Sequence, residues 1–557
     1  MAELNDDITS DLLVIGSGAA GCSCALEAAK RGLQVIVITN AADPSESNSD
    51  HAQGGIVARP PDDTAESLAA DIMEAGDGLC NEEAVRLLVE SVPEVIAGFL
   101  VGELGVAFSR TPEGDLDYTQ EAAHSRRRIA HADDATGRAI SQKLLQAVSR
   151  QNNIRLLPKH SAVDLITVPH HSVDPTTIYR GVECLGAYVL DQAAGTVGRF
   201  FAAHTVLATG GLGQLYLHTT NPRVARGDGL AMAHRAGADI INAEYVQFHP
   251  TSFYHPAVVR PWRASADSRA RTAAGERPDG DRFLISESVR GEGAILRTRD
   301  GRDFMKDYHP DGSLAPRDVV ARAIHEEMLK RGEEYVVLDL EPLLTGRRSG
   351  GSAAPVDARA RFPTIYETCL QYGLDITKQP IPVVPAAHYF CGGVKVDTWG
   401  RTNIRRLHAV GEVSCTGVHG ANRLASTSLL EAIVWGRRAA EHAAGHHARF
   451  DAHWIGKIAH WHDEGLTEAI DPLLVIQDWM MIKSTMWNYA GIVRTSKRLD
   501  RAVADLSYLA HRIEQFYRET KLADSLIGLR NGIAAAQIVA QAARRNTQSR
   551  GCHYRGD

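Results

Sequence analysis

The sequence predicts an α/β fold, and three patterns along its 557 residues support this prediction. Two short apolar runs, 12–15 and 33–38, enclose a glycine-rich turn and a helical stretch, as in a strand–turn–helix–strand unit. Two further apolar runs, 205–211 and 407–412, end in glycines and in a glutamate. From about residue 460 the apolar residues recur with helical spacing. These patterns indicate a nucleotide-binding domain that is interrupted by an inserted domain and followed by a helical one.

The glycine-rich turn is Gly16-Ser17-Gly18-Ala19-Ala20-Gly21, a G-x-G-x-x-G pattern placed between a strand and a helix. In such a turn the first glycine permits the tight bend, the second lets the backbone approach a pyrophosphate, and the third allows close packing of helix on strand. The helix N-terminus then offers free N–H groups to the phosphates. We interpret the segment as a dinucleotide site, the alternative being a tight structural turn.

The end of the second strand lacks the usual acidic residue, because Thr39 and Asn40 stand there. Thr39 can bond a ribose hydroxyl, though more weakly than a carboxylate. The later strands favour FAD over NAD: one enters a turn at Gly210, and the other delivers Glu412 to the edge where ligands bind in open α/β sheets. A carboxylate at that edge suits a ribityl or ribose hydroxyl.

Composition narrows the class of protein. Apolar residues make up 44% and charged residues 23%, and the formal net charge is −8, which is typical of a globular protein and not of a general nucleic-acid or anionic-membrane binder. No apolar run is long enough to span a membrane. The start lacks the features of a secretory signal, and the eight cysteines include no CxxC pair. We expect a cytoplasmic enzyme with reduced thiols and no metal.

Two other features have plain structural interpretations. The arginine-rich segments 256–282 and 345–361 are typical of solvated surface loops. The tryptophans and methionines between 479 and 487 lie at a spacing typical of helix packing.

Several motifs in a fixed order carry a specific resemblance. The chain resembles the succinate dehydrogenase/fumarate reductase flavoprotein family and, within it, the branch that oxidises L-aspartate. The motifs are GSGAAG (16–21), DHAQGG (50–55), ATGG (208–211), QFHPT (247–251), RGEGA (290–294), PRDVVARAI (316–324), PAAHY (385–389) and HGANRLASTSLLEA (419–432).

The resemblance implies a fold, domain bounds and an activity. The fold is a Rossmann-type FAD-binding domain (1–242 and 390–459) with an inserted α+β capping domain (243–389) and a C-terminal helical domain (460–557). The activity is oxidation of L-aspartate to iminoaspartate, with O2 (giving H2O2) or fumarate as acceptor, as the first step of quinolinate and NAD biosynthesis. Quinolinate synthase would be the functional partner. The alternatives are a flavoprotein subunit of a fumarate reductase or succinate dehydrogenase, and a non-catalytic flavoprotein.

The resemblance also assigns the residues at the substrate. Arg317 matches the catalytic arginine, and Glu287 and Arg290 match a proton relay that runs from it toward solvent. Arginine suits a carboxylate because its planar fork bonds both oxygens. The expected substrate ligands are His249, Ser286, His388, Arg423 and Gln247.

Two positions separate the branches of the family. The respiratory members attach FAD to a histidine five residues before the glutamine of the AQGG motif; Asn48 stands there, which predicts noncovalent FAD. Glu121 matches an acidic residue of the aspartate-oxidising branch, where a carboxylate can pair with the α-ammonium or act as a base. The expected FAD contacts are Gly16, Ser17, Gly18, Ala19, Gly21, Thr39, Asn48, Ser49, Asp50, His51, Ala52, Gln53, Gly54, Gly55, Gly210, Asp228, Glu412, Ser428 and Leu429.

Overall fold

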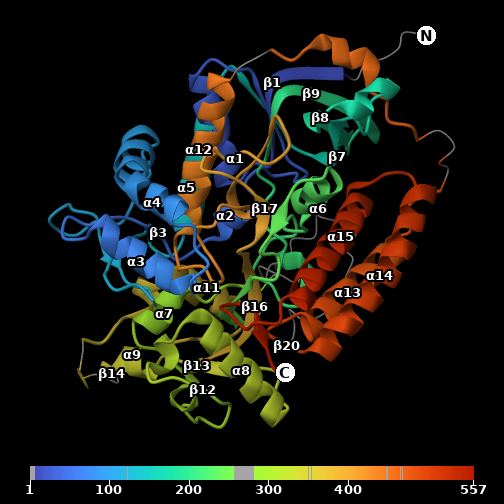
Figure 1. The fold of residues 1–557 in the computed structure, drawn as a ribbon. Coiled ribbons are helices and arrows are strands. Elements are labelled where there is room, and N and C mark those ends of the chain that lie inside the picture. Colours follow the sequence, from blue (N-terminus) through green and yellow to red (C-terminus); the bar gives the residue numbers. More distant parts are fainter. Residues whose placement is uncertain are drawn as a thin grey trace.

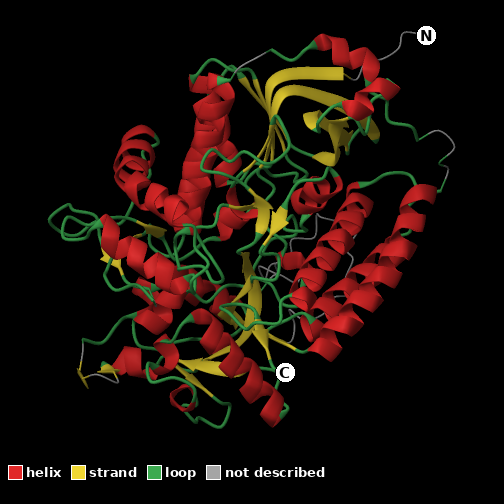
Figure 2. Ribbon diagram, viewed as in Figure 1, coloured by secondary structure: helices red, strands yellow, loops and turns green. Residues whose placement is uncertain are grey.

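A computed structural model describes residues 7–121, 123–255, 282–348, 351–352, 354–446, 449–463, 466 and 468–557. Three groups of elements are visible in Figure 1: a sheet with flanking helices at the top, a smaller sheet with helices at the bottom, and three long helices at the right. Figure 2 shows that loops fill the region where these groups meet. Of the arginine-rich segment 256–282, all but Arg282 lies outside the described residues.

The largest sheet has seven strands, and its centre is parallel, as expected for a nucleotide-binding domain. The order is β6-β2-β1-β9-β8-β7, with β18 pairing with β9 as well. The runs predicted as strands at 12–15, 33–38, 205–211 and 407–412 all contribute strands, in part or in full. The bounds are β1 (Asp7–Ile15), β2 (Val35–Ile38), β6 (Ile154–Leu157), β7 (His160–Val168), β8 (Glu183–Asp191), β9 (Thr196–Leu207) and β18 (Leu407–Ala409).

The parallel register aligns the carboxyl ends of four strands at one edge of this sheet. Ile15 lies opposite both Ile38 and Leu207, and Leu207 lies opposite Ala409. The residues that follow these ends therefore share one crevice, although they come from segments nearly 400 residues apart in the chain (residues 16 and 412). This edge is where open α/β sheets bind ligands.

Helix α1 (Ala19–Lys30) lies against this sheet and against α12 (Ser428–Gly445), as Figure 1 shows. The approach is close because glycines stand at the two points where a Cβ would collide with the backbone. Gly16 has φ +118°, and a Cβ on Gly21 would lie 2.0 Å from the Gly16 carbonyl oxygen. The helix ends before Gly32, which has φ +85°, a left-handed conformation that favours glycine after a helix.

Shorter elements surround the crevice on the left of Figure 1. Among them Arg128 is fully buried and forms ion pairs of 2.9 Å with both Asp63 and Asp71, which fixes the loop before β5 against α3. The elements are α2 (Asn48–His51), β3 (Ile56–Val57), α3 (Ala65–Ala75), α4 (Glu82–Pro93), a π-helical segment (Glu94–Glu103), β4 (Tyr118–Thr119), β5 (Ile129–Ala130) and α5 (Thr136–Ser149).

The lower group of elements has its own hydrophobic core, whose members run from Phe253 to Val383. Its sheet has the order β11-β16-β13-β12, and it is the predicted inserted domain. The bounds are β11 (Val246–Phe253), α7 (Glu287–Gly291), β12 (Ile295–Arg297), α8 (Arg317–Arg331), β13 (Val336–Asp339), α9 (Glu341–Thr345), β14 (Arg347–Arg348), β15 (Gly351–Ser352), α10 (Ala358–Arg361), α11 (Pro363–Gln371) and β16 (Ile381–Phe390).

Two further groups connect this domain to the rest. Strands β10 (Ile240–Ile241), β17 (Gly393–Lys395) and β19 (Ser414–Cys415) form a small sheet where the chain enters and leaves it. The C-terminal helices are α13 (Pro472–Tyr489), α14 (Ser496–Glu519) and α15 (Asp524–Arg545), and β20 (Val493–Arg494) pairs with β21 (Tyr554–Arg555). Helix α6 (Asp228–Arg235) packs on α15. Ile482 and Met486 of α13 are fully buried, which confirms the helix-packing interpretation. The exact domain bounds stay predictions.

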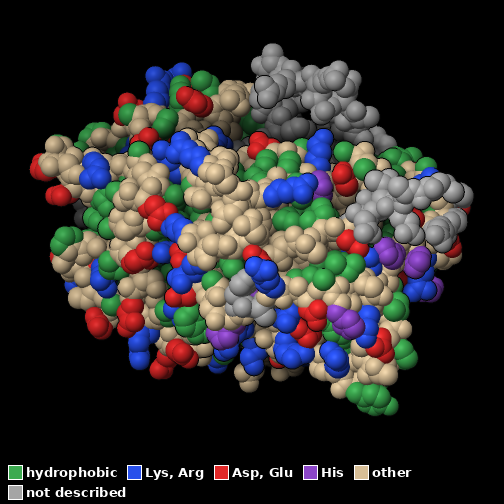
Figure 3. Space-filling view, turned by 90° about the horizontal axis from the view of Figure 1, so that it is seen from above, with side chains coloured by type: hydrophobic (Ala, Val, Ile, Leu, Met, Phe, Trp, Pro, Cys, Tyr) green, Lys and Arg blue, Asp and Glu red, His purple; other side chains and the backbone are tan. Residues whose placement is uncertain are grey.

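The surface carries charges of both signs. Lys and Arg side chains are interspersed with Asp and Glu over the face in Figure 3. None of the helices in the described part of the chain is long and apolar enough to cross a membrane.

The close approach at the glycine turn leads to a prediction. Gly21→Ala places a methyl group 2.0 Å from a backbone oxygen, so α1 must move away from the turn, and overpacking of this kind typically costs about 1–3 kcal/mol. We expect purified Gly21→Ala to have lost its bound dinucleotide and to melt at a lower temperature. The control is Gly445→Ala in α12, where the new methyl group meets nothing within 4 Å. Unchanged cofactor content in Gly21→Ala would contradict the assignment.

Candidate active site

One cavity runs along the carboxyl edge of the large sheet and reaches the capping domain. It holds about 1650 Å³ of space free of protein atoms, its open mouth included. Most of the residues predicted for FAD and substrate line it: Gly16, Ser17, Gly18, Ala19, Thr39, Asn48, Ser49, His51, Ala52, Gln53, Gly54, Gly55, Glu121, Gly210, Asp228, His249, Ser286, Glu287, Arg317, His388, Glu412, Arg423, Ser428 and Leu429. Gly21, Asp50, Gln247 and Arg290 do not line it.

The residues at the sheet end of the cavity fit a polar dinucleotide such as FAD. Asn48 Oδ1, Gln53 Oε1 and Thr209 Oγ1 are buried and have no hydrogen-bond partner among the described residues. Buried polar atoms without partners cost stability, so these three atoms indicate a bound polar group. Gly21 serves packing and not contact, and Asp50 is turned toward Arg138, whose Nε lies 3.6 Å from its Oδ2.

Glu412 closes the sheet end as the sequence predicts. Asn48 Nδ2 donates to its Oε2 at 2.6 Å, and the Phe390 backbone N–H donates to its Oε1 at 2.9 Å. Burial raises the pKa of Glu412 to about 7, so its carboxyl group can either donate to or accept from a ligand hydroxyl near neutral pH. Asn48 therefore fixes the position of the Glu412 carboxyl group.

Asp228 and Glu46 are two acidic residues in the wall of the cavity. Asp228 begins α6, and its carboxylate already accepts from Arg226 at 2.8 Å and from Asn531 at 3.0 Å. Glu46 lines the cavity together with Thr39. The dinucleotide-binding pattern expects an acidic residue directly after the second strand, where Thr39 stands instead. It therefore does not identify Glu46, which lies further along in the loop after β2.

Two histidines lie side by side at the capping end. The rings of His249 and His388 are 5.1 Å apart between centroids, and burial lowers the pKa of each well below its ordinary value. Both rings are therefore neutral near pH 7. His249 Nδ1 accepts from the Thr251 backbone N–H at 3.2 Å, which leaves the proton on Nε2 as a donor.

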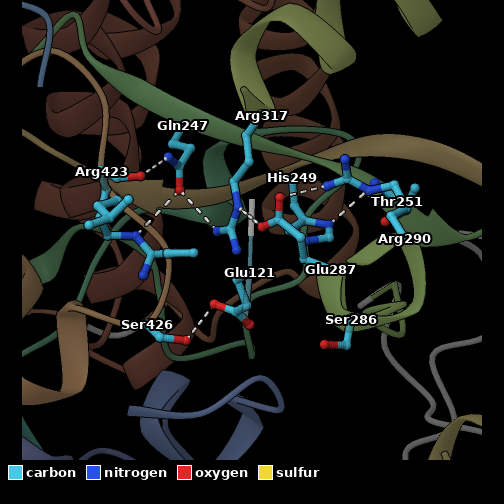
Figure 4. Close-up of polar contacts among 12 residues, drawn as sticks. Glu121, Gln247, His249, Thr251, Ser286, Glu287, Arg290, Arg317, Arg423 and Ser426 are labelled. Atoms are coloured by element: carbon cyan, nitrogen blue, oxygen red, sulfur yellow. Dashed lines mark hydrogen bonds and ion pairs between the residues drawn. The ribbon is translucent and has the colours of Figure 1, made fainter. Parts of the chain in front are cut away.

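Arg317, the first residue of α8, is at the centre of the site in Figure 4. Its Nε lies 2.5 Å from Glu287 Oε2, and Glu287 Oε1 accepts from Arg290 Nη2 at 3.0 Å. Burial alone would raise the pKa of Glu287, but the charges of Arg317 and Arg290 outweigh burial and hold that pKa below its ordinary value. The row of Arg317, Glu287 and Arg290 implied by the resemblance is therefore assembled, with an ionised carboxylate at its centre.

The expected direction of this row is wrong in one respect, because Arg290 does not lead to solvent. Its side chain is fully buried, and its Nη1 donates to the Ser313 carbonyl oxygen at 2.7 Å. A second cavity, which none of the predicted FAD contacts lines, instead reaches Glu287 and Arg317, and Asp318 is among the residues that line it. Access to water is therefore at the Arg317–Glu287 pair, and Arg290 is a buried counter-ion.

Gln247 is not free to contact a substrate, contrary to the prediction. It is fully buried, and its Nε2 donates to Asn422 Oδ1 at 2.7 Å and to the Arg423 carbonyl oxygen at 2.8 Å. Its Oε1 lies 3.4 Å from Arg317 Nη1 and 3.3 Å from Arg423 Nε. Gln247 therefore holds the two arginines, as the dashed lines in Figure 4 show.

Glu121 faces the same space from the other side. Ser426, which has φ +60°, donates from its Oγ to Glu121 Oε2 at 2.6 Å. Burial is the largest effect on Glu121 and raises its pKa, and Glu287 adds to the rise. Sequence reasoning missed Ser426, because only the fold brings it to Glu121 from 305 residues away.

The remaining predicted contacts are at helix starts. Ser286 caps α7 and accepts from Ser288 Oγ at 2.9 Å. Ser428 begins α12 and accepts from Arg423 Nη1 at 3.0 Å, and Leu429 follows it in the cavity wall. No group of three or more His, Cys, Asp or Glu side chains in the described ranges is arranged to hold a metal ion.

Comparison with known proteins agrees with this geometry. The family described as FAD binding domain matches residues 11–429, and the family described as fumarate reductase flavoprotein C-term matches residues 480–557. Among solved structures, an E. coli quinol fumarate reductase chain superposes with a TM-score of 0.80 at 26% identity, covering 99% of this chain and 92% of that one. Fold and site therefore define an FAD-containing flavoprotein of the fumarate reductase class.

The relatives of known name are more specific. "L-aspartate oxidase 1" of Ralstonia nicotianae is 43% identical, covering 98% of this chain and 95% of its own. "L-aspartate oxidase" of Halobacterium salinarum is 42% identical, with 100% and 98% covered. A chloroplastic L-aspartate oxidase of Oryza sativa is 41% identical, with 100% and 83% covered. The chain belongs to the L-aspartate oxidase family.

Asn48 leads to a prediction about the cofactor. An amide cannot form the bond that a histidine makes to FAD, and here it is engaged with Glu412. We expect all flavin to be released into the supernatant when the purified protein is precipitated with acid, as read by visible absorbance. Flavin that stays with the washed pellet would show a covalent link elsewhere.

Proposed function

We propose that this protein oxidises L-aspartate to iminoaspartate with FAD as its cofactor. The observation that carries the proposal is that the site buries more guanidinium groups than carboxylates that pair with them. One further carboxylate, that of Glu121, lies beside these groups. Arg317 is 8% exposed and Arg423 is 5% exposed, and in the described part of the chain Arg423 has no carboxylate within ion-pair distance. A dicarboxylate supplies the missing negative charge.

The two carboxylates of the substrate have matched partners. Guanidinium groups bond carboxylates with two parallel hydrogen bonds, and Arg317 and Arg423 share the acceptor Gln247 Oε1, so both forks occupy a defined place. The neutral His249 and His388 add donors without adding charge. A dicarboxylate held in this way is fixed at both ends.

Glu121 is the feature that favours an amino-dicarboxylate over succinate. Near a dianion without an ammonium group, its carboxylate would be repulsive. L-Aspartate carries an α-ammonium group, which a carboxylate can pair with and from which it can take a proton. The raised pKa of Glu121 makes it a stronger base than an exposed glutamate, and Ser426 holds it in place.

FAD, when bound, would supply the two-electron acceptor for the Cα–H bond of the substrate, and O2 (giving H2O2) or fumarate would be the final electron acceptor. The residues of the chain orient the substrate, hold its charges and exclude water, since His249, both arginines and Glu121 are nearly buried. Glu121 receives the ammonium proton, and the Arg317–Glu287 pair can exchange protons with the second cavity.

The names of the relatives support the same activity. Product chemistry and family membership place the reaction at the first step of quinolinate formation, and hence of NAD biosynthesis. We infer functional coupling to quinolinate synthase, which would consume the imine. The free, buried thiols among the described cysteines are consistent with a reducing compartment such as the cytoplasm. The alternative is a flavoprotein subunit of a fumarate reductase or succinate dehydrogenase.

The proposal is tested by anaerobic bleaching of the flavin. We expect L-aspartate to bleach the visible flavin band of the purified protein and succinate to bind without bleaching it. Arg317→Leu is expected to keep FAD and to lose turnover by about 10²-fold or more, because a preorganised charged contact to the reacting substrate is gone. Bleaching by succinate alone would favour the dehydrogenase alternative.

The pKa of Glu121 gives a second test. Its carboxylate form pairs with the ammonium group, so kcat/KM for L-aspartate should rise with pH through the raised pKa, above the ordinary value for glutamate, and then level off. Glu121→Gln should remove this limb and lower kcat/KM about 10²-fold. The internal control is the affinity of the variant for succinate. Succinate has no ammonium group to pair with Glu121, so this affinity should not fall. An unchanged pH limb in Glu121→Gln would refute the role.

A further inference from the structure

The acceptor shared by the two substrate arginines is at the end of a hydrogen-bonded chain. Gln247 Oε1 faces Arg317 and Arg423, and Gln247 Nε2 donates to Asn422 Oδ1 at 2.7 Å. Asn422 Nδ2 in turn donates to Asp318 Oδ1 at 3.3 Å. Gln247 is fully buried and Asn422 is 7% exposed, so water does not compete freely for these groups.

The two ends of this chain determine the orientation of the amides between them. An ionised carboxylate only accepts hydrogen bonds, so Asp318 requires the NH2 group of Asn422. The carbonyl of Asn422 must then face Gln247, which must turn its own NH2 group toward it. Gln247 thereby presents its oxygen to two guanidinium groups, which only donate. Reversing Gln247 would set its NH2 group against the two guanidinium groups, and reversing Asn422 would set its NH2 group against Gln247 Nε2 and its oxygen against the Asp318 carboxylate.

We propose that Asp318, Asn422 and Gln247 form a chain of fixed hydrogen-bond polarity that positions Arg317 and Arg423 for the substrate carboxylates. All three are positioning residues, since they act through the arginines. The inference rests on the proposed function in one respect, because it takes these arginines as dicarboxylate ligands. It does not depend on which dicarboxylate is oxidised.

The chain joins separate parts of the fold. Gln247 lies in β11 and Asp318 in α8, both in the capping domain, whereas Asn422 lies in the loop between β19 and α12. A chain of this kind is complete only when the capping domain and the FAD-binding domain lie in their present relative positions. It therefore couples the placement of both arginines to that arrangement.

The C-terminal segment supports the chain at its outer end. Arg322 pairs with Asp318 Oδ2 at 2.8 Å, and its Nη1 donates to the Gly551 carbonyl oxygen at 3.3 Å. The Arg322 guanidinium also lies 5.0 Å from the centre of the Tyr554 ring. The Cys552 thiol donates to Asn422 Oδ1 at 3.2 Å, which adds a second donor to the same carbonyl. The last residues of the chain thus take part in orienting the substrate arginines.

The test exchanges the side chains of Asp318 and Asn422, at the outer end of the hydrogen-bonded chain. Asp318→Asn removes the group that demands an NH2 partner, and Asn422→Asp sets a carboxylate against the carboxylate of Asp318. In the double variant D318N/N422D, the new amide can donate to the new carboxylate, which still accepts from Gln247 Nε2 and the Cys552 thiol. The orientation of Gln247 is then the same as in the unmodified protein.

We expect each single variant to bind succinate at least about tenfold more weakly, a loss typical of a hydrogen bond to a charged group. Binding is read from the perturbation of the flavin spectrum in the holoenzyme, and kcat/KM for L-aspartate should fall in parallel. The double variant should recover to within about threefold, because close pairs couple in this way. The control is Asp311→Asn, because Asp311 lines the second cavity together with Asp318. This variant should leave succinate binding unaltered.

Two results would overturn the proposal. One is a pair of single variants that bind succinate like the unmodified protein. The other is a double variant whose loss equals the product of the single losses, at equal FAD content and melting temperature, since that pattern means independent packing defects. Failure of the proposed function is distinguishable: a protein that binds succinate but does not oxidise L-aspartate leaves this cycle fully measurable.

Discussion

The burial of more guanidinium groups than carboxylates is the constraint on which the rest of the site depends. Arg290, Arg317 and Arg423 are all at most 8% exposed, and Glu287 is the one carboxylate within ion-pair distance of them in the described structure. Removing a cation from water is costly unless its donors are satisfied. Neutral acceptors satisfy part of this need, and a dicarboxylate completes it, so affinity for substrate follows from the electrostatics of the empty protein.

Two buried glutamates near each other have opposite pKa shifts, and their neighbours explain the difference. Glu287 lies between two guanidinium groups, which outweigh its burial and keep it ionised. Glu121 is bonded to a serine hydroxyl, and its burial dominates. One carboxylate is therefore a permanent counter-ion, whereas the other can change its charge during a reaction. Such a division is how a single site supplies distinct acid–base roles at one pH.

The fold places these groups by combining two kinds of geometry. The FAD end depends on strand register, since four parallel strands end at the same edge. The substrate end lies between domains, where β11 and α8 meet the loop before α12. Residues contributed by separate bodies can be brought together and shielded from water in one step. The C-terminal segment contacts the same junction through Cys552 and Arg322.

By itself the sequence determined the glycine turn, the strands around it, and the identities of the groups that hold charge, because these depend on local spacing and on side-chain chemistry. Gly16, Gly21 and Glu412 could be assigned in this way, and Arg317 through the resemblance of the motif that contains it. Only the tertiary structure decided that Gln247 serves the arginines instead of the substrate, that Arg290 is closed off from solvent, and that Glu46, Ser426 and Asn422 belong to the site. Those roles depend on contacts between segments far apart in the chain, and the direction of a buried amide is decided by the donors and acceptors that folding places around it.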